Sequence, residues 1–310
     1  MKVKFARPLF ALISIFFVLV QPALAESTAE KSQLIPRSVS EKSHLIWEGK
    51  IADSTVHLMG SIHYGMPSMY PLPKRIMSAF ERSTALLVEV DISKASPAST
   101  MALIKENGFY QDGSTLKDHL TASQFTRLER DVAQWGVPVS ALLQHKPWLV
   151  VMSLTAIAVK AQGYSETLGV DQYFLDRIGS KKVIEIESLE QQISLMSGFN
   201  EEVQQWMLVQ GLGELNRATI ELDAMLTNWK RGNESAFYEQ TVKEFPEGEL
   251  SQTVYQQVFI DRNRSMAEFV EKLASSKPGR YFVVVGAGHL VGPEGVPALL
   301  SKKGHAINRY

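Results

Sequence analysis

The chain has 310 residues, of which 45% are hydrophobic and 21% are charged, and its formal net charge is -1. This balance suits one globular domain, with or without a helical insertion, and argues against long disorder and against a nucleic-acid-binding surface. The sequence contains no cysteine. Disulfides, thiolate metal sites, iron–sulfur clusters and thiol nucleophiles are therefore excluded, and any bound metal must be held by His, Asp or Glu.

The first 25 residues have the pattern of a secretion signal. A basic start is followed by an apolar run over residues 9–20, which is too short to span a membrane comfortably. Ala23, Leu24 and Ala25 then form the A-x-A pattern of a cleavage site. We expect a signal peptide over residues 1–25, cleaved after Ala25, and a periplasmic or secreted protein. An uncleaved N-terminal anchor is the alternative, and no transmembrane segment is expected after cleavage.

The mature chain is predicted to be one folded domain preceded by a polar segment. Residues 26–44 lack periodicity and are expected to form a flexible lead-in, so that the domain covers 45–310. Residues 45–50 and 55–61 have the pattern of two short strands joined by a turn near Asp53.

A strand–helix–strand unit follows. Pro73 suits the first turn of a helix, and Leu72, Ile76 and Phe80 give that helix an apolar face. Residues 85–91 read as a buried strand. Together with the strand before the helix they make a βαβ unit, which favours a parallel pair.

The rest of the chain alternates helical stretches with strands, which predicts a mixed α/β (α+β) fold with a central, largely parallel sheet and helical insertions. We expect helices within 98–162, from Val170, over 201–232, over 250–275 and over 296–303, and strands over 182–187, 280–285 and 306–309.

Polar side chains gather at four predicted strand ends, and ligands bind beyond the carboxyl ends of parallel strands. These residues are His63 after the strand over 55–61, Glu89 and Asp91, Glu185 and Glu187, and His289 after the strand over 280–285.

Two histidines share a local pattern. Gly60 precedes His63 by three residues and Gly286 precedes His289 by three, each after an apolar strand. We expected the glycines to let the backbone turn away from the strand. Two imidazoles with a carboxylate such as Glu89 suit zinc, manganese, cobalt or iron(II), and three protein ligands leave a position for water.

Each residue also has a structural interpretation. Glu89 within an apolar strand could form a buried salt bridge, and Glu187 could lie on the wet face of an edge strand. Asp171 could favour a helix dipole, and Arg262 could be a solvated helix residue. The glycine pattern at Gly286 resembles a dinucleotide fingerprint, but its spacing is one residue too long.

The chain resembles the TraB/GumN (TraB/PrgY/GumN) family, which includes the Tiki-type metalloproteases. The resemblance is carried over residues 45–310 by His57 to Gly65, Tyr70 to Pro73, Leu86 to Val90, Gly169 to Asp171, Val183 to Glu187 with Gln192, Asp261 to Asn263, and Tyr281 to Gly292.

The resemblance implies a fold similar to the erythromycin-esterase and ChaN-like proteins. It also implies that the family's two G-x-x-H motifs and glutamate fall on His63, His289 and Glu89. Tiki-type relatives are metal-dependent proteases that use manganese or cobalt-like ions, so the resemblance implies a divalent metal (Mn, Co or Zn).

Two classes of function follow. The first is a periplasmic metal-dependent hydrolase, with peptidase activity as one form of it, acting on a peptide or small-molecule substrate. In it Glu187 or Asp171 acts as a general base or orients an imidazole, and Arg262 or Asn263 stabilises an oxyanion. The second is a non-catalytic accessory protein of the cell envelope that binds a ligand, haem or iron. A metal-free esterase is a third alternative, and a homo-oligomer is compatible with either class.

Overall fold

A six-stranded sheet forms the centre of the computed structural model, which describes residues 43–94, 96–215, 218–243 and 247–310. The predicted signal peptide and nearly all of the lead-in lie outside the described residues. The sheet has the order β4-β3-β5-β2-β1-β6. The strands are β1 (Ile46–Ile51), β2 (Ser54–Ser61), β3 (Ala85–Val88), β4 (Lys182–Glu185), β5 (Arg280–Gly286) and β6 (Ala306–Arg309).

The predicted mixed α/β fold with a mostly parallel sheet is confirmed. Strands β4, β3, β5 and β2 are parallel, and β1 and β6 add an antiparallel edge. One detail of the prediction is wrong. Strands β2 and β3 of the βαβ unit are not neighbours, because β5 lies between them and pairs with both. Strands β2 and β3 are still parallel to each other, because each is parallel to β5.

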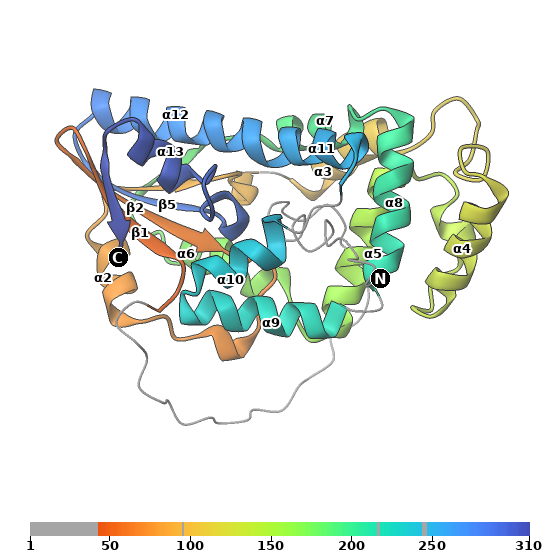
Figure 1. Ribbon diagram of the computed structural model, residues 1–310, viewed down its shortest axis with the longest axis horizontal. Helices are drawn as coiled ribbons and strands as arrows, with labels where there is room; N and C mark the ends of the chain where they lie inside the picture. The colour runs from red at the N-terminus through yellow and green to blue at the C-terminus, as the bar shows by residue number, and fades with distance from the viewer. Residues whose placement is uncertain (1–42, 95, 216–217, 244–246) are drawn as a thin grey trace.

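The helices fall into two groups (Figure 1). Around the sheet lie α12 and α13 on one side and α2 and α6 on the other, and further helices extend the molecule beyond the carboxyl ends of the parallel strands. The α-helices are α2 (Lys74–Glu81), α3 (Pro97–Gly108), α4 (Ala122–Ala133), α5 (Pro147–Ala161), α6 (Val170–Leu175), α7 (Leu189–Ser197), α8 (Glu201–Leu215), α9 (Ala218–Arg231), α10 (Glu234–Tyr238), α11 (Glu249–Tyr255), α12 (Arg262–Ser276) and α13 (Val296–Lys302).

Short 3₁₀ and π turns connect or extend these helices. They are the 3₁₀ turns η1 (Pro67–Met69), η2 (Ile92–Lys94), η3 (Val139–Leu142), η4 (Glu166–Leu168) and η7 (Ala287–His289), and the π-helical turns η5 (Glu239–Lys243) and η6 (Gln256–Asp261).

An aromatic cluster joins the sheet to the helices below it. The rings of Phe80 on α2, Phe174 on α6 and Phe282 on β5 are all fully or almost fully buried, with centroids 4.8–5.5 Å apart. These tilted and edge-on contacts add to the burial of three large side chains. The cluster therefore fixes α6, which carries Asp171, against the central strand of the sheet.

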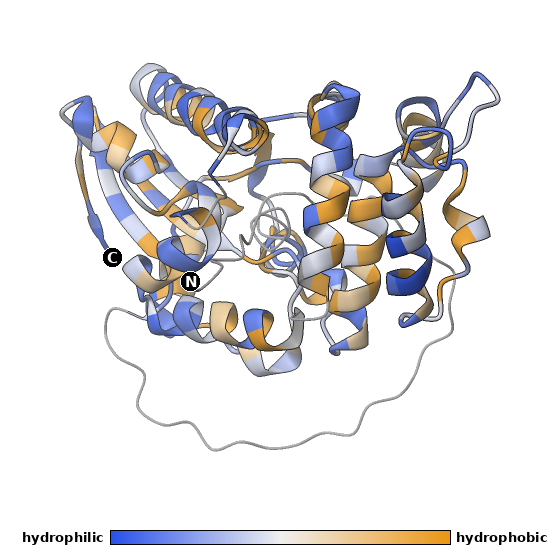
Figure 2. Cartoon of the chain, turned by 45° about the vertical axis from the view of Figure 1, so that its right-hand side comes forward, coloured by the Kyte–Doolittle hydropathy of each residue, from blue (hydrophilic) through white to orange (hydrophobic). Residues whose placement is uncertain are grey.

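The helical extension has its own apolar centre. Helix α5 is buried along most of its length and packs mainly against α8. A helix that is apolar on all sides requires neighbours on all sides, and Figure 2 shows hydrophobic colour spread over the closely packed helices of this part of the molecule. None of the described helices is long and apolar enough to cross a membrane.

The helix boundaries differ from the predictions in one place. The long helical stretch predicted over 201–232 is occupied by α8 and α9, which lie on either side of residues 216–217, outside the described residues. The stretch predicted over 250–275 comprises α11, the π turn η6 and α12. A π turn widens the helix by one residue per turn and changes the direction in which the next side chains point.

Candidate functional site

His63 lies in the loop directly after β2 and is held by α6. The Val170 amide donates to the Ile62 carbonyl, and a Cβ on Gly169 would collide with the His63 carbonyl. This close approach places Asp171, in the first turn of α6, beside the histidine. Asp171 Oδ2 lies 2.7 Å from His63 Nδ1.

Ser61 completes this side of the site. Its hydroxyl donates to the same oxygen of Asp171. The carboxylate thus accepts from both the hydroxyl and the His63 ring, and it fixes the ring's orientation. With Nδ1 as the donor to Asp171, the neutral ring carries its lone pair on Nε2.

His289 lies on η7, the 3₁₀ turn that follows β5, and its orientation can be traced through Asn263. The Asn263 amide nitrogen donates to the Glu294 carbonyl at 2.7 Å, so its oxygen must be the atom that faces His289. That oxygen lies 2.5 Å from His289 Nδ1. An amide oxygen only accepts, so Nδ1 carries the proton and Nε2 carries the lone pair.

A buried charge network lies between the two histidines. Arg262 donates to Glu187 from Nε and Nη2 and to Glu89 from Nη2, at 2.7–3.2 Å. The Gln192 amide donates to both carboxylates, at 3.2 Å to Glu89 and 3.1 Å to Glu187. The second Glu89 oxygen accepts from the Gly286 amide at 2.5 Å. Every oxygen of both carboxylates thus has a donor, as burial requires.

Two local features position the donors of this network. Helix α7 begins after Glu187 with a capping box in which Ser188 and Gln191 satisfy each other's backbone amides, and this start places Gln192 over the carboxylates. On α12, Arg262 and Asn263 are consecutive, so their side chains diverge by about 100°. One therefore reaches the carboxylates while the other reaches His289.

The network shifts the pKa of each central group. Burial raises the pKa of Glu89, to about 7, against the opposing effects of Arg262 and His63. Burial alone would lower the pKa of His63, but the adjacent Asp171 carboxylate raises it above its ordinary value. Burial and the Arg262 charge hold the pKa of His289 well below its usual range. Burial would raise the pKa of Glu187, but Arg262 lowers it.

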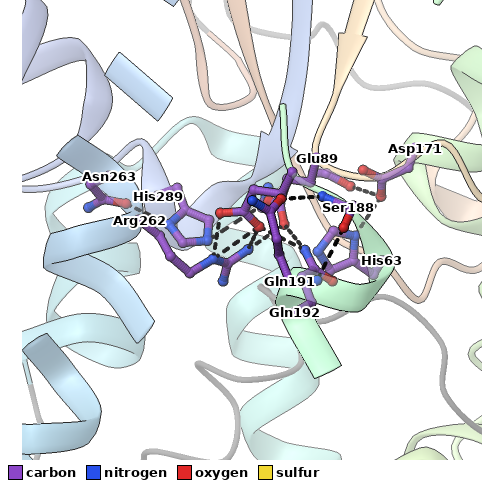
Figure 3. A network of polar contacts seen from close by, with 12 residues as sticks. His63, Glu89, Asp171, Ser188, Gln191, Gln192, Arg262, Asn263 and His289 are labelled. Atoms are coloured by element: carbon purple, nitrogen blue, oxygen red, sulfur yellow. Dashed lines mark hydrogen bonds and ion pairs between the residues drawn. The ribbon is translucent and has the colours of Figure 1, made fainter. Parts of the chain in front are cut away.

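Figure 3 shows His289, Asn263 and Arg262 on one side of the network and His63 with Asp171 on the other. His289 is fully buried and His63 and Glu89 are 1% and 3% exposed. His289 Nε2 lies 3.9 Å from Glu89 Oε1 and has no hydrogen-bond partner among the described residues. In the part of the chain that the structure describes, no three His, Asp or Glu side chains form a ready-made metal-binding group.

The structure brings together all of the residues predicted for the site. Two sets of contacts from six segments of the chain hold these residues: Glu89, Glu187, Arg262, Asn263 and His289 form one, and His63 with Asp171 forms the other. The charges of Glu89 and Arg262 act on the His63 ring, so the two sets lie close together.

Three contributors were missed in the sequence. The Ser61 hydroxyl and the Gly286 amide act through tertiary contacts that have no sequence pattern of their own. Gln192 follows a capping box, which marks the start of α7 but not the contact of Gln192 with Glu89. Asp91 and Glu185 form a separate contact beside the network. In it, the Glu185 carboxylate accepts a hydrogen bond from the Asp91 amide.

Comparison with known proteins decides the family. The chain matches the sequence pattern that defines the TraB/PrgY/gumN family over residues 45–309. The chain belongs to the TraB/PrgY/gumN family. It is 26% identical over 258 residues to a protein of Escherichia coli strain K12 named YbaP and described as uncharacterized, covering 79% of this chain and 87% of the relative.

Two further relatives of this TraB-family chain are similar. One is the Shigella flexneri protein of the same name, with the same identity and coverage. The other is an uncharacterized protein of Treponema pallidum strain Nichols, 21% identical over 308 residues, covering 94% of this chain and 91% of the relative. No solved structure matches the chain significantly.

In this TraB-family chain the glycines of the two G-x-x-H motifs do not adopt the left-handed backbone of a sharp glycine turn, and packing explains the glycine at position 60. Neither Gly60 nor Gly286 has a positive φ angle. A Cβ on Gly60 would lie 3.0 Å from the Ala287 side chain and 3.2 Å from the Leu45 carbonyl. Glycine therefore lets β2 approach the turn that carries His289, which brings the two histidine loops close together.

Proposed function

We propose that the protein is a metal-dependent hydrolase of the cell envelope, acting on peptides, and that His63, Glu89 and His289 hold its divalent ion. The observation that carries the proposal is the fixed orientation of the two rings. Asp171 and Asn263 each engage Nδ1, which leaves Nε2 as the ligating atom of each imidazole. Metal-binding histidines are commonly oriented in this way by a carboxylate or an amide oxygen.

The donor set fits manganese, cobalt or zinc in type, with two imidazole nitrogens and one carboxylate. The spacing is slightly wide. Two ligands that hold one ion at about 2.1 Å stand about 3.0–3.4 Å apart at angles of 90–110°, whereas His289 Nε2 and Glu89 Oε1 are 3.9 Å apart. A shift of a few tenths of an ångström in these side chains would make the separation suitable.

When bound, the ion would lower the pKa of a water molecule and so supply a hydroxide nucleophile near neutral pH. Arg262 supports this chemistry by holding Glu89 and Glu187 in place with its guanidinium group. Its buried positive charge is also suited to stabilising negative charge that develops on a substrate carbonyl.

Glu89 and Glu187 are suited to different roles. The raised pKa of Glu89 marks a buried carboxylate whose negative charge is costly, and a bound cation would stabilise that charge. The lowered pKa of Glu187 makes it a weak proton acceptor, which favours a role in anchoring Arg262. Asp171 and Asn263 are best suited to orienting the histidines.

The alternative of haem capture is less consistent with the burial of the histidines. His289 is fully buried and His63 is 1% exposed, so a macrocycle would reach either ring only after the covering helices moved. A Soret band that appears when haem is added, and that is lost in His289→Ala, would favour the haem-binding alternative.

The proposal is tested by hydrolysis of a mixed peptide library after treatment with a chelator and after addition of manganese, cobalt or zinc. We expect cleavage that the chelator abolishes and one of the ions restores, and none in His63→Ala or His289→Ala. His305→Ala is the matched control, because the His305 ring is 20% exposed and pairs with Glu271 at 2.8 Å, outside the polar network of the site. Cleavage that persists in the chelator would point instead to a metal-free esterase or peptidase.

A further inference from the structure

A cleft of about 440 Å³ lies beside the polar network, between α3 and α7 and at the carboxyl ends of β3 and β4. Two of the residues that line it directly follow the buried Glu89 and Glu187 in the sequence. Val90 follows Glu89 and Ser188 follows Glu187, and both line the cleft. The residues that line the cleft include none of the proposed metal ligands, and the cleft lies at the edge where α/β sheets bind ligands.

Negatively charged side chains predominate in the lining of this cleft. Four carboxylates and one ammonium group line it: Asp91, Glu106, Glu185 and Glu190 against Lys94. The walls also include the apolar side chains of Ala102, Leu103 and Leu189. Carboxylates beside an apolar wall suit a ligand that has a hydrocarbon chain ending in a positive charge.

Two of the carboxylates are arranged to receive an ammonium group. Asp91 Oδ1 accepts from the Ser93 amide at 3.2 Å and its hydroxyl at 2.5 Å, and Glu185 Oε1 accepts from the Asp91 amide at 2.8 Å. The other oxygen of each carboxylate faces Lys94. The Lys94 ammonium lies 3.1 Å from Asp91 Oδ2 and 3.3 Å from Glu185 Oε2.

Lys94 is therefore an amine of the chain itself in the position that a ligand's amine would take. Its side chain is 57% exposed, whereas that of Asp91 is 3% exposed. An exposed lysine that pairs with fixed carboxylates gains little free energy from the pair, because water screens the interaction and the long side chain loses entropy. A ligand that also buries its hydrocarbon chain against the apolar wall can displace it.

We propose that this cleft binds a lysine side chain of the peptide substrate, whose ammonium group takes the place that Lys94 holds between Asp91 and Glu185. The identity of the ligand as a substrate rests on the proposed hydrolase function. The ammonium-binding cleft itself rests only on the geometry of α3, α7 and the two strand ends.

The test is calorimetric binding of two peptides, acetyl-Gly-Gly-Lys-Gly-Gly-amide and its norleucine counterpart, which keeps the hydrocarbon chain and lacks the charge. We expect the lysine peptide to bind about tenfold more tightly, the effect of one charge-assisted pair. Glu185→Gln should abolish this difference. Lys94→Met should strengthen binding of the lysine peptide by up to about fivefold, because the competing amine is gone.

Glu129→Gln is the matched control, since it removes the same charge from an exposed position on α4 outside the cleft. Equal binding of the two peptides, weaker binding in Lys94→Met, or an equal effect of Glu129→Gln and Glu185→Gln would overturn the proposal. The titrations are run in a chelator and repeated in His289→Ala. A lysine preference that persists there supports the cleft even if hydrolysis is never found, and a missing preference counts against the cleft alone.

Discussion

Replacing Arg262 should lower the free energy of unfolding by more than a typical substitution of an exposed residue does. Its guanidinium donates four hydrogen bonds of 2.7–3.2 Å to Glu89 and Glu187, and its own side chain is 8% exposed. In Arg262→Met two buried carboxylates lose their counter-ion. Breaking a buried pair from one side costs about 3–5 kcal/mol, and we expect a loss of this size in the free energy of unfolding at pH 8.

The loss should depend on pH in a definite direction. Burial already raises the pKa of Glu89 to about 7 with Arg262 present, so its ionised form is the costly one when folded. The lowered pKa of Glu187 contributes stability above its ordinary pKa, and this contribution disappears with Arg262. The variant's carboxylates should therefore take up protons as the pH falls, and the difference from wild type should shrink between pH 8 and pH 5.

Urea unfolding followed by circular dichroism measures this difference. Arg264→Met is the control, because Arg264 lies on the same helix with its side chain 58% exposed, and its ion pair to Asp261 is 3.9 Å long. The control should change stability by no more than about 0.5 kcal/mol. A loss below about 1 kcal/mol in Arg262→Met, or a loss that is the same at both pH values, would refute this account of the network.

Three further predictions concern the site. Asn263→Leu should weaken binding of manganese or zinc by about ten- to a hundredfold, measured by competition with a chelating dye, because His289 loses the acceptor that fixes its tautomer; unchanged affinity would contradict this role. Metal affinity should fall steeply from pH 8 to pH 5.5 in the same assay, because the pKa values of Glu89 and His63 are raised and both must lose a proton to bind the ion; affinity that is constant over this range would count against these ligands. Gly60→Ala should lower the free energy of unfolding by about 1–3 kcal/mol in urea titrations, because the new methyl group meets atoms at 3.0–3.2 Å; a neutral effect would show that the turn can move away.

Much of the site could be predicted because its residues follow apolar strands. The runs before His63, Glu89 and His289 identify three strands, and the rule that parallel strands bind ligands at their carboxyl ends brings these ends together. The polar residues of the predicted strand over 182–187, which ends at Glu187, follow the same logic. The prediction did not need the order of the strands, which is why it survived the misplaced pairing of β2 with β3.

The contacts within the site could not be predicted in this way. That Arg262 bridges two carboxylates while Asn263 orients a histidine depends on the direction of α12 after a π turn, and a π turn has no local sequence signal. Helix α7 is different. Ser188 and Gln191 have the spacing of a capping box, so its start could have been recognised and Gln192 placed near the strand end.

The most direct test of the proposed metal centre is the metal content of the protein, purified without a metal-binding tag, in wild type, His289→Ala and the surface control His305→Ala. The account predicts about one equivalent of a divalent ion in wild type and in the control, and none in His289→Ala with an unchanged circular dichroism spectrum. No bound ion in wild type, even after incubation with manganese, cobalt or zinc, would contradict the assignment of His63, Glu89 and His289 as ligands.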